Sequence, residues 1–289
     1  SNSFNADSSY TFEIESYNSN GDLINGLLPI GAEISWSSTT GQITNSGLNQ
    51  AILSPTMNGL QTITACYGII CTDYLVNVES GLPVQILASL SQTTDIDYIT
   101  ITADQTVNIS AYALDQHGNI VTNEIINFLV SNGTISTMNT FNPYTVGNQT
   151  ITAEWIGPTN SIQELLYVDV TPGAPSQVSL HGCDEVINAG ESCLLYASAF
   201  DQYQNVVWFD DVDSFTMSVE DGETVLFPIL TPHSVPPQTN VLIGEYTGNL
   251  VGQWDVTLTT NSNLMDNIIV EVTHGAFAEL ELTASESTI

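Results

Sequence analysis

The segment YALDQHGNIV at residues 112–121 recurs in altered form as SAFDQYQNVV at residues 198–207. In both copies an Asp-Gln pair follows apolar residues, and an Asn then precedes two β-branched residues. ESYNSNGDLI at residues 15–24 occupies the same place earlier in the chain, with Asn18 at the position of the Asp. Polar turn residues between apolar runs indicate a reversal between two strands. The recurrence indicates a chain built from repeats.

Two further markers recur in the same order. Strand-like segments end at Gly81, Gly173 and Gly275, which lie 92 and 102 residues apart, and a second strand-like segment follows each glycine. The other marker is a glycine strand that reads NGLQTITA, VGNQTITA and VGQWDVTL in its three copies. Three markers in a fixed order define a unit of about 90–100 residues.

Short alternating strands separated by turn residues predict an all-β fold of tandem β-sandwiches with Greek-key connections. We expect domains at residues 1–80, 81–172 and 173–274, and a final segment, 275–289, that forms the first strand of a further unit or a donor strand. The segments ISWSSTTG, INFLVSNG and FTMSVEDG align as one central strand of the unit. Its inward-facing side chains would be Ile34, Trp36, Ile126, Phe128, Phe215 and Met217.

These markers resemble the immunoglobulin-like repeats of bacterial and archaeal surface proteins of the invasin and intimin type. The resemblance rests on the Asp-Gln-x-x-Asn turns at 115–119 and 201–205, on ADQTVNISAYALDQHGNIV, and on the Gly-x-x-Thr-Ile-Thr-Ala strand. It covers nearly the whole chain. It implies tandem immunoglobulin-like β-sandwiches that serve as a stiff, extracellular rod of an adhesin, a surface layer or a filament. The implied partners are adjacent repeats, neighbouring copies, or a cell-surface protein.

The phase of the repeat differs at the two ends of the chain. When ADSSYTF, ADQTVNI and AGESCLL are aligned, 16–22 residues precede this point in units two and three, but only five precede it in unit one. Unit one is therefore expected to lack its first strand, whereas GAFAELELTASESTI at residues 275–289 reads as a first strand without its unit.

Two interpretations of this phase remain open. The chain is a segment of a longer tandem array, or its tail inserts into the open groove of unit one in the next molecule. In the second case backbone hydrogen bonds provide affinity, and Phe277, Leu280 and Leu282 fill alternate pockets. Such a contact does not close on itself, so it produces a head-to-tail fibre.

The charge composition excludes several classes of function. The chain contains no Lys and no Arg, and its formal net charge is −32. Binding to nucleic acids, to anionic membranes and to phosphate ligands depends on cationic side chains that contact phosphate groups. All three functions are therefore disfavoured. A lysine-based covalent centre is impossible. No run of 18 apolar residues occurs, so the sequence predicts no transmembrane segment.

The four cysteines form two local pairs. Cys66 and Cys71 flank a four-residue connection, and Cys183 and Cys193 lie at the end of one expected strand and the start of the next. Even, close pairs on a β-rich chain with an extracellular character favour the disulfides 66–71 and 183–193. A metal site would require all four cysteines to converge from different domains.

Other candidate sites have weaker patterns. Three sequons for N-glycosylation occur in unit two, at Asn108, Asn132 and Asn148. Acidic residues gather at Asp95, Asp97, Asp210, Asp211 and Asp213 without the spacing of a calcium loop. We therefore expect no cofactor, with Ca²⁺ as the open alternative to solvated turn acids.

The sequence does not indicate an enzyme. The four histidines are scattered, and no zinc-protease, nucleophile-elbow or phosphate-loop motif occurs. The alternative to a structural rod is a module that binds carbohydrate or protein. DQYQNVVWFDDVDSF at residues 201–215 is the segment of interest, because Tyr203 and Trp208 beside acids could stack on a sugar ring. Equally, Trp208 could cover the edge of the core.

Overall fold

The computed structural model describes residues 4–24, 33–90, 97–183, 186–208, 215–219 and 240–275. Every regular element in these ranges is a β-strand, so the all-β prediction is confirmed. They include no helix that is long and apolar enough to cross a membrane. The chain divides into two compact units: unit 1 holds 1–99, 107–141 and 148–168, and unit 2 holds 100–106, 142–147 and the part from 169 onward.

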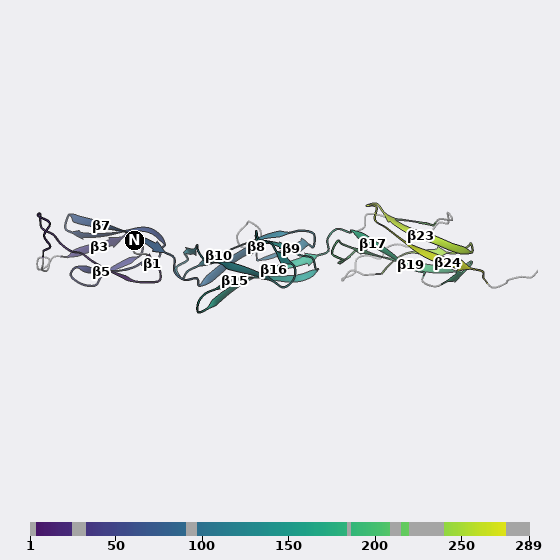
Figure 1. Ribbon diagram of the computed structural model, residues 1–289, viewed down its shortest axis with the longest axis horizontal. Helices are drawn as coiled ribbons and strands as arrows, with labels where there is room; N and C mark the ends of the chain where they lie inside the picture. Colours follow the sequence, from purple (N-terminus) through teal and green to yellow (C-terminus); the bar gives the residue numbers. More distant parts are fainter. Residues whose placement is uncertain are drawn as a thin grey trace, which may run out of the picture. The chain divides into compact units, whose positions relative to one another are not determined.

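The first pair of sheets, purple to blue in Figure 1, lies in unit 1. Its strands are β1 (Phe4–Asn5), β2 (Tyr10–Glu13), β3 (Ile34–Ser38), β4 (Gln42–Asn45), β5 (Gln50–Ser54), β6 (Gly59–Tyr67) and β7 (Ile70–Glu79). One sheet has the order β1-β7-β6-β3 and the other β2-β5-β4, so successive strands pass back and forth between the two sheets. Leu53 of one sheet and Ile63, Val76 and Val78 of the other share one buried cluster, as in a sandwich.

The second pair of sheets follows the same plan. Its strands are β8 (Gln85–Leu90), β9 (Tyr98–Thr102), β10 (Val107–Leu114), β11 (Ile120–Val121), β12 (Ile126–Val130), β13 (Thr134–Ile135), β14 (Thr140–Asn142), β15 (Gly147–Ile156) and β16 (Ser161–Thr171). One sheet has the order β12-β15-β16-β9. The other has the order β11-β10-β14-β13, with β8 paired to β10 as well.

The third pair of sheets lies in unit 2. Its strands are β17 (Gln177–Gly182), β18 (Ile187–Asn188), β19 (Ser192–Phe200), β20 (Val206–Val207), β21 (Phe215–Val219), β22 (Val241–Thr247), β23 (Gly252–Thr260) and β24 (Met265–Thr273). One sheet has the order β18-β24-β23-β21, and in the other β19 pairs with β17, β20 and β22. β2, β10 and β19 are thus equivalent strands, as are β6, β15 and β23.

The glycine marker has a backbone cause. Gly59, Gly147 and Gly252 open the equivalent strands β6, β15 and β23 with φ angles of 105°, 113° and 151°. Residues with a Cβ rarely adopt such positive φ values, so glycine is the residue that fits at this entry point. The marker therefore records one backbone conformation used three times.

One expectation about strand position is wrong. β3, β12 and β21 do turn Ile34 and Met217 into the core, and Trp36, Ile126, Phe128 and Phe215 are half-buried. Among the described residues, however, each of these strands is the last in its sheet and not a central one. Alternating apolar residues show that one face of a strand is buried, but they carry no information about its place across the sheet.

Candidate functional site: an open strand edge and two junction clusters

The equivalent strands β10 and β19 are paired along both edges. Ala113 and Leu114 of β10 pair with β8 and also with β11. The residues Leu195–Ala197 of β19 pair with β17 and also with β22. The strand that precedes each repeat, β8 or β17, thus completes one edge of that repeat.

Among the described strands, β2 is paired along one edge only. It pairs with β5, and an isolated bridge joins Tyr17 to Leu23 just beyond it. In the described part of the chain no strand lies along the other edge, where β8 and β17 lie in the other repeats. Among the described strands, the unpaired edge of β2 lies at the position where the sequence phase predicts a missing first strand, and that domain boundary stays a prediction.

The backbone groups of the open edge can be identified. The Ile14 N–H donates to the Asn49 carbonyl at 3.0 Å, and the Ser16 carbonyl accepts from the Ile24 N–H at 2.9 Å, both on the paired side. Backbone groups of successive strand residues point to opposite edges. The main-chain groups of Glu13, Glu15 and Tyr17 consequently point to the open edge.

Core side chains beside the open edge are uncovered. Tyr67 of β6 is 39% exposed, whereas Trp155, its equivalent in β15, is 2% exposed. Tyr74 of β7 is 55% exposed, whereas Leu166, its equivalent in β16, is fully buried. In the second repeat Ile86 of β8 packs in one cluster with Ala153 and Trp155. Within the described ranges, the first repeat has the same wall of side chains but no counterpart of Ile86 that covers it.

Two adjoining hollows of about 580 and 380 Å³ mark this opening. They share Ile14, Glu15, Tyr17, Ala65 and Thr72, so they form one groove between the β2 edge and strands β6 and β7. We call it the β2 groove. Its larger part is lined by Ile14, Ile34, Ala65, Tyr67 and Ile70, which are the equivalents of Ala111, Ile126, Ala153, Trp155 and Ile162 around Ile86.

The rim of the β2 groove is acidic. The Tyr17 hydroxyl donates to Glu15 Oε2 at 2.7 Å, and this hydrogen bond and the nearby negative charge raise the pKa of Tyr17. Asp73 accepts from the Thr64 hydroxyl at 2.6 Å beside the smaller hollow. An apolar floor with polar rims is suited to a strand with alternating apolar and polar residues.

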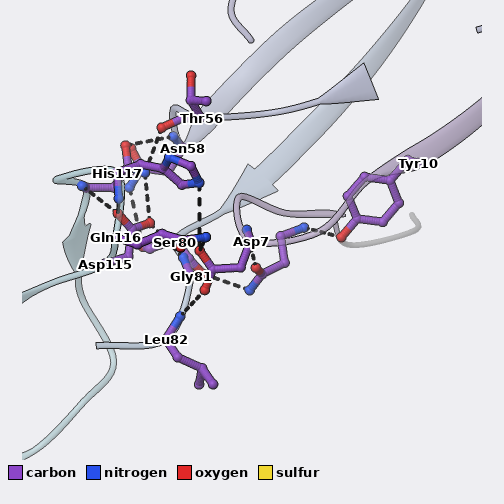
Figure 2. A network of polar contacts seen from close by, with 12 residues as sticks. Asp7, Tyr10, Thr56, Asn58, Ser80, Gly81, Leu82, Asp115, Gln116 and His117 are labelled. Atoms are coloured by element: carbon purple, nitrogen blue, oxygen red, sulfur yellow. Dashed lines mark hydrogen bonds and ion pairs between the residues drawn. The ribbon is translucent and has the colours of Figure 1, made fainter. Parts of the chain in front are cut away.

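A second feature is a polar cluster where the first pair of sheets leads into the second (Figure 2). The buried Asp115 carboxylate accepts from the Gly81 N–H at 2.8 Å and from the Asn119 side-chain amide at 2.8 Å. Its other oxygen accepts from the His117 and Asn119 N–H groups, both at 2.9 Å. Burial alone would raise the pKa of Asp115, but the hydrogen bonds from Asn119, Gly81 and His117 outweigh it and lower the pKa below 3.8.

Asn119 connects this turn to the preceding repeat. Its side-chain amide donates to the Thr56 carbonyl at 3.0 Å, and its side-chain oxygen accepts from the Asn58 N–H at 3.2 Å. Asp7 completes the cluster, because its carboxylate accepts from the Leu82 N–H at 2.7 Å and from the Gln116 side-chain amide at 3.0 Å (Figure 2). We call Asp7, Asn58, Gly81, Asp115 and Asn119 the junction 1 cluster.

Equivalent hydrogen bonds occur around Asp201, among residues that all belong to the second compact unit. Asp201 accepts from the Gly173 N–H at 2.9 Å and from the Asn205 side-chain amide at 2.8 Å. Asn205 in turn donates to the Tyr144 carbonyl at 3.1 Å and accepts from the Val146 N–H at 3.2 Å. We call Asp104, Val146, Gly173, Asp201 and Asn205 the junction 2 cluster.

Asp104 has the role of Asp7 in the junction 2 cluster. Its carboxylate accepts from the Ala174 N–H at 3.4 Å and from the Thr102 hydroxyl. The Thr102 hydrogen bond is the main cause that lowers the pKa of Asp104, with a smaller contribution from the Ala174 N–H and partial opposition from burial. The sequence indicates that the Asp-Gln-x-x-Asn turns are repeated, but it does not predict that they hold the linker glycines. The recurrence of Asp and Gly at fixed spacing was the available signal.

The predicted site residues fall in several places. Cys66 is bonded to Cys71 and Cys183 to Cys193, with S–S distances of 2.10 and 1.90 Å. Asn108 and Asn148 are exposed and Asn132 is half-buried, so the sequons at Asn108 and Asn148 are accessible to solvent. Tyr203 is exposed and Trp208 half-buried.

Other predicted residues lie outside the described residues: Phe277, Leu280, Leu282, Asp95, Asp210, Asp211 and Asp213. Asp97 is described and exposed, and its carbonyl accepts from the Tyr167 N–H at 2.7 Å. Within the described ranges, no group of three or more His, Cys, Asp or Glu side chains is placed to hold a metal ion.

Comparison with known proteins gives distant structural likeness only. No protein-family model and no curated protein matches the chain. Among solved structures, FdeC, an adhesin of Escherichia coli, is 17% identical with a TM-score of 0.46, covering 89% of each chain. InvD of Yersinia pseudotuberculosis is 14% identical with a TM-score of 0.46, covering 94% of this chain and 96% of its own. Invasin, a bacterial integrin-binding protein, is 17% identical with a TM-score of 0.44, covering 93% of this chain and 58% of its own.

Proposed function

We propose that the chain is an extracellular structural subunit that assembles head to tail, with residues 276–289 of one copy occupying the β2 groove of the next. The observation that carries this proposal is the open edge of β2, with Tyr67 and Tyr74 uncovered beside it. An exposed edge invites pairing with another chain, so a protein that keeps one open is expected to use it or to cover it.

The occupant is identified by the repeat. AFAELELTA at residues 276–284 has the place after Gly275 that β8 has after Gly81 and β17 has after Gly173. Both β8 and β17 pair with the strand that corresponds to β2. The tail therefore has the sequence position and the alternating pattern of the strand that the β2 groove accommodates.

The internal repeats also give the register. Ile86 pairs with Ala113 in the second repeat, and Val178 pairs with Ala199 in the third. The same offset places Leu280 of one copy opposite Ser16 of the next copy, and Leu282 opposite Ile14. Leu280 then occupies the place that Ile86 has against Trp155, which in the first repeat is the hollow beside Tyr67.

Backbone hydrogen bonds extend this register. The Val84 N–H donates to the Leu114 carbonyl, and the Ser176 N–H donates to the Phe200 carbonyl, both at 2.8 Å. The corresponding bond at the β2 groove joins the Ala278 N–H of one copy to the Tyr17 carbonyl of the next. Burying Leu280 and Leu282 would contribute about 1.5–3 kcal/mol each, before the cost of association.

The location and class of the protein are part of the proposal. Two local disulfides suit an oxidising, extracellular setting. The absence of Lys and Arg removes every cleavage site for trypsin-like proteases. We assign the chain no catalytic activity and no cofactor, and its partners are neighbouring copies at a cell surface.

The test is self-association of the full chain with the groove-filling residues changed. We expect the unmodified chain to form linear oligomers in sedimentation and electron microscopy as concentration rises. The Leu280→Asp/Leu282→Asp variant should stay monomeric, because two carboxylates would enter an apolar groove. Glu281→Gln, on the opposite face of the same strand, is the matched control and should assemble.

A synthetic peptide of residues 275–289 provides the second arm. It should terminate oligomers of the unmodified chain and protect the backbone of residues 13–17 from hydrogen exchange in the Leu280→Asp/Leu282→Asp variant. The proposal is wrong if the unmodified chain is a monomer at all concentrations and the peptide leaves exchange unchanged. Protection of residues 13–17 within a lone monomer would instead show that the groove is filled by its own tail.

A further inference from the structure

The turn of the first repeat has the same backbone as the turns in the two junction clusters. The Asn18 N–H donates to the Asp22 carbonyl at 2.9 Å, as the Asp115 N–H donates to the Asn119 carbonyl at 3.0 Å. Gly21 has a φ of 86°, close to the 82° of its equivalent Gly118. The first repeat therefore presents an equivalent turn at its own leading end.

The acid and the amide are exchanged in this turn. Asn18 stands at the position of Asp115 and Asp201, and Asp22 stands at the position of Asn119 and Asn205. The Asn18 side-chain oxygen accepts from the Asn20 and Asp22 N–H groups, both at 2.9 Å, and its amide nitrogen donates to Asp22 Oδ2 at 3.0 Å. These bonds fix the orientation of the amide, because a carboxylate only accepts.

The exchange swaps the hydrogen-bond donor and acceptor groups that this turn would present to a preceding repeat. In the junction 1 cluster an Asp115 oxygen accepts from the linker Gly81, and the Asn119 amide donates to the Thr56 carbonyl. In the first repeat an amide NH₂ would face the linker N–H, and a carboxylate would face the carbonyl. These two hydrogen bonds would become a donor–donor and an acceptor–acceptor contact, which cost free energy when water is excluded. A carboxylate at position 22 could still accept the remaining bond, the one that the Asn119 oxygen accepts from the Asn58 N–H.

The other end of the chain departs from the pattern independently. Asp7 and Asp104 accept from the first N–H after the linker glycine, at Leu82 and Ala174 respectively. The equivalent residue in the third repeat is Gly190, which has no side chain to accept from the N–H after Gly275. Each partner of a joint between copies thus lacks groups that take part in the two internal junctions.

We infer that the joint between copies is held mainly by the inserted strand, without a complete junction cluster. This inference rests on the proposed head-to-tail assembly. The internal junctions are fixed by hydrogen bonds to buried carboxylates, whereas the joint between copies bends and separates more readily. A neighbouring copy is therefore distinguished from an internal repeat by the chemistry of residues 18 and 22.

The experiment installs the internal turn at the leading end. The Asn18→Asp/Asp22→Asn variant restores the residue types of Asp115 and Asn119 on a backbone that already matches. We expect its oligomers to dissociate about tenfold more slowly on dilution, the effect of one added hydrogen bond to a charged group. Joints in electron micrographs should also show a narrower distribution of bend angles.

The reverse exchange in the junction 1 cluster is the matched variant. Asp115→Asn/Asn119→Asp should accelerate thermolysin cleavage at the linker residues 82–84, whereas Asn18→Asp/Asp22→Asn should leave cleavage there unchanged. The inference is overturned if oligomers of the Asn18→Asp/Asp22→Asn variant dissociate and bend like those of the unmodified chain; assembly itself would then stand. If the unmodified chain forms no oligomers, the proposed assembly is wrong and the inference falls with it.

Discussion

The Asp115 carboxylate accepts a hydrogen bond of 2.8 Å from the Gly81 N–H, 34 positions earlier in the chain. Gly81 follows the last strand of one repeat, and Asp115 follows the strand that begins the core of the next. Asp201 and Gly173 repeat this bond at 2.9 Å. Each linker glycine is therefore held by a carboxylate of the repeat that follows it.

Replacing Asp115 with Asn should lower stability by about 2–4 kcal/mol at neutral pH. The carboxylate is 3% exposed and accepts four N–H bonds, and an Asn amide nitrogen would face donors instead. Denaturant unfolding of the full chain measures the loss, with Glu271→Gln on the exposed face of β24 as the control. A loss no larger than that of the control would contradict the role of this carboxylate.

The same variant should show a defined pH dependence. The folded pKa of Asp115 is lowered from the ordinary value of 3.8, so its contribution to stability is complete only at a pH well above that value. It is lost as the pH falls from there through the folded pKa. The stability difference between the unmodified chain and Asp115→Asn should therefore stay constant from about pH 7 to pH 5 and shrink below about pH 4. A difference that grows on acidification would contradict the assignment.

Gly81→Ala should be more harmful than Gly173→Ala. A Cβ at Gly81 would lie 2.1 Å from the Asp7 carboxylate oxygens, whereas one at Gly173 would lie 3.1 Å from the nearest Asp104 atom. The first substitution must displace Asp7 and its bond to the Leu82 N–H, so we expect a cost of about 1–3 kcal/mol. The second needs only a small adjustment. Melting temperatures of the two variants, measured side by side, give the comparison, and equal losses would show that the close approach at Gly81 has no energetic weight.

Tyr67→Ala should cost much less stability than Trp155→Ala, although the two residues occupy equivalent places. Trp155 is buried under Ile86, so its removal should cost about 3–5 kcal/mol. Tyr67 is 39% exposed at the β2 groove, so we expect about 1 kcal/mol in the chain without an occupant. Adding the peptide 275–289 should enlarge the Tyr67 effect and leave the Trp155 effect unchanged. Equal costs for the two substitutions without peptide would show that Tyr67 is already covered.

The two disulfides should contribute unequally. The Cys183–Cys193 bond closes a loop with a sequence separation of 10, and the Cys66–Cys71 bond closes one of 5. Loop entropy assigns about 3 kcal/mol to the first and about 2 kcal/mol to the second. Paired Cys→Ser variants in denaturant unfolding test the order. A larger loss for the 66–71 pair would indicate that this bond also shapes the wall of the β2 groove, to which Cys71 belongs.

Much of the fold follows from the sequence because strand patterns are local. Alternation of apolar residues predicted that Ile34 and Met217 are buried, and the positive φ values of Gly59 and Gly147 explain why these markers recur. The position of β3, β12 and β21 at sheet ends was not predictable in this way. Which strands flank another is decided by pairings between residues far apart in sequence, and a burial pattern does not report them.

The sequence by itself predicted the repeat, its strands, the two close cysteine pairs and a first repeat that lacks its first strand, since all of these predictions rest on spacing and alternation along the chain. Only the tertiary structure showed that Ile14, Ala65 and Tyr67 form one apolar wall, and that Asp115 holds Gly81. These relationships join residues from separate strands and turns. They exist only once folding has removed the water between these residues. An exposed apolar wall then gains free energy when another chain covers it, and a buried carboxylate is stabilising only because N–H groups donate to it.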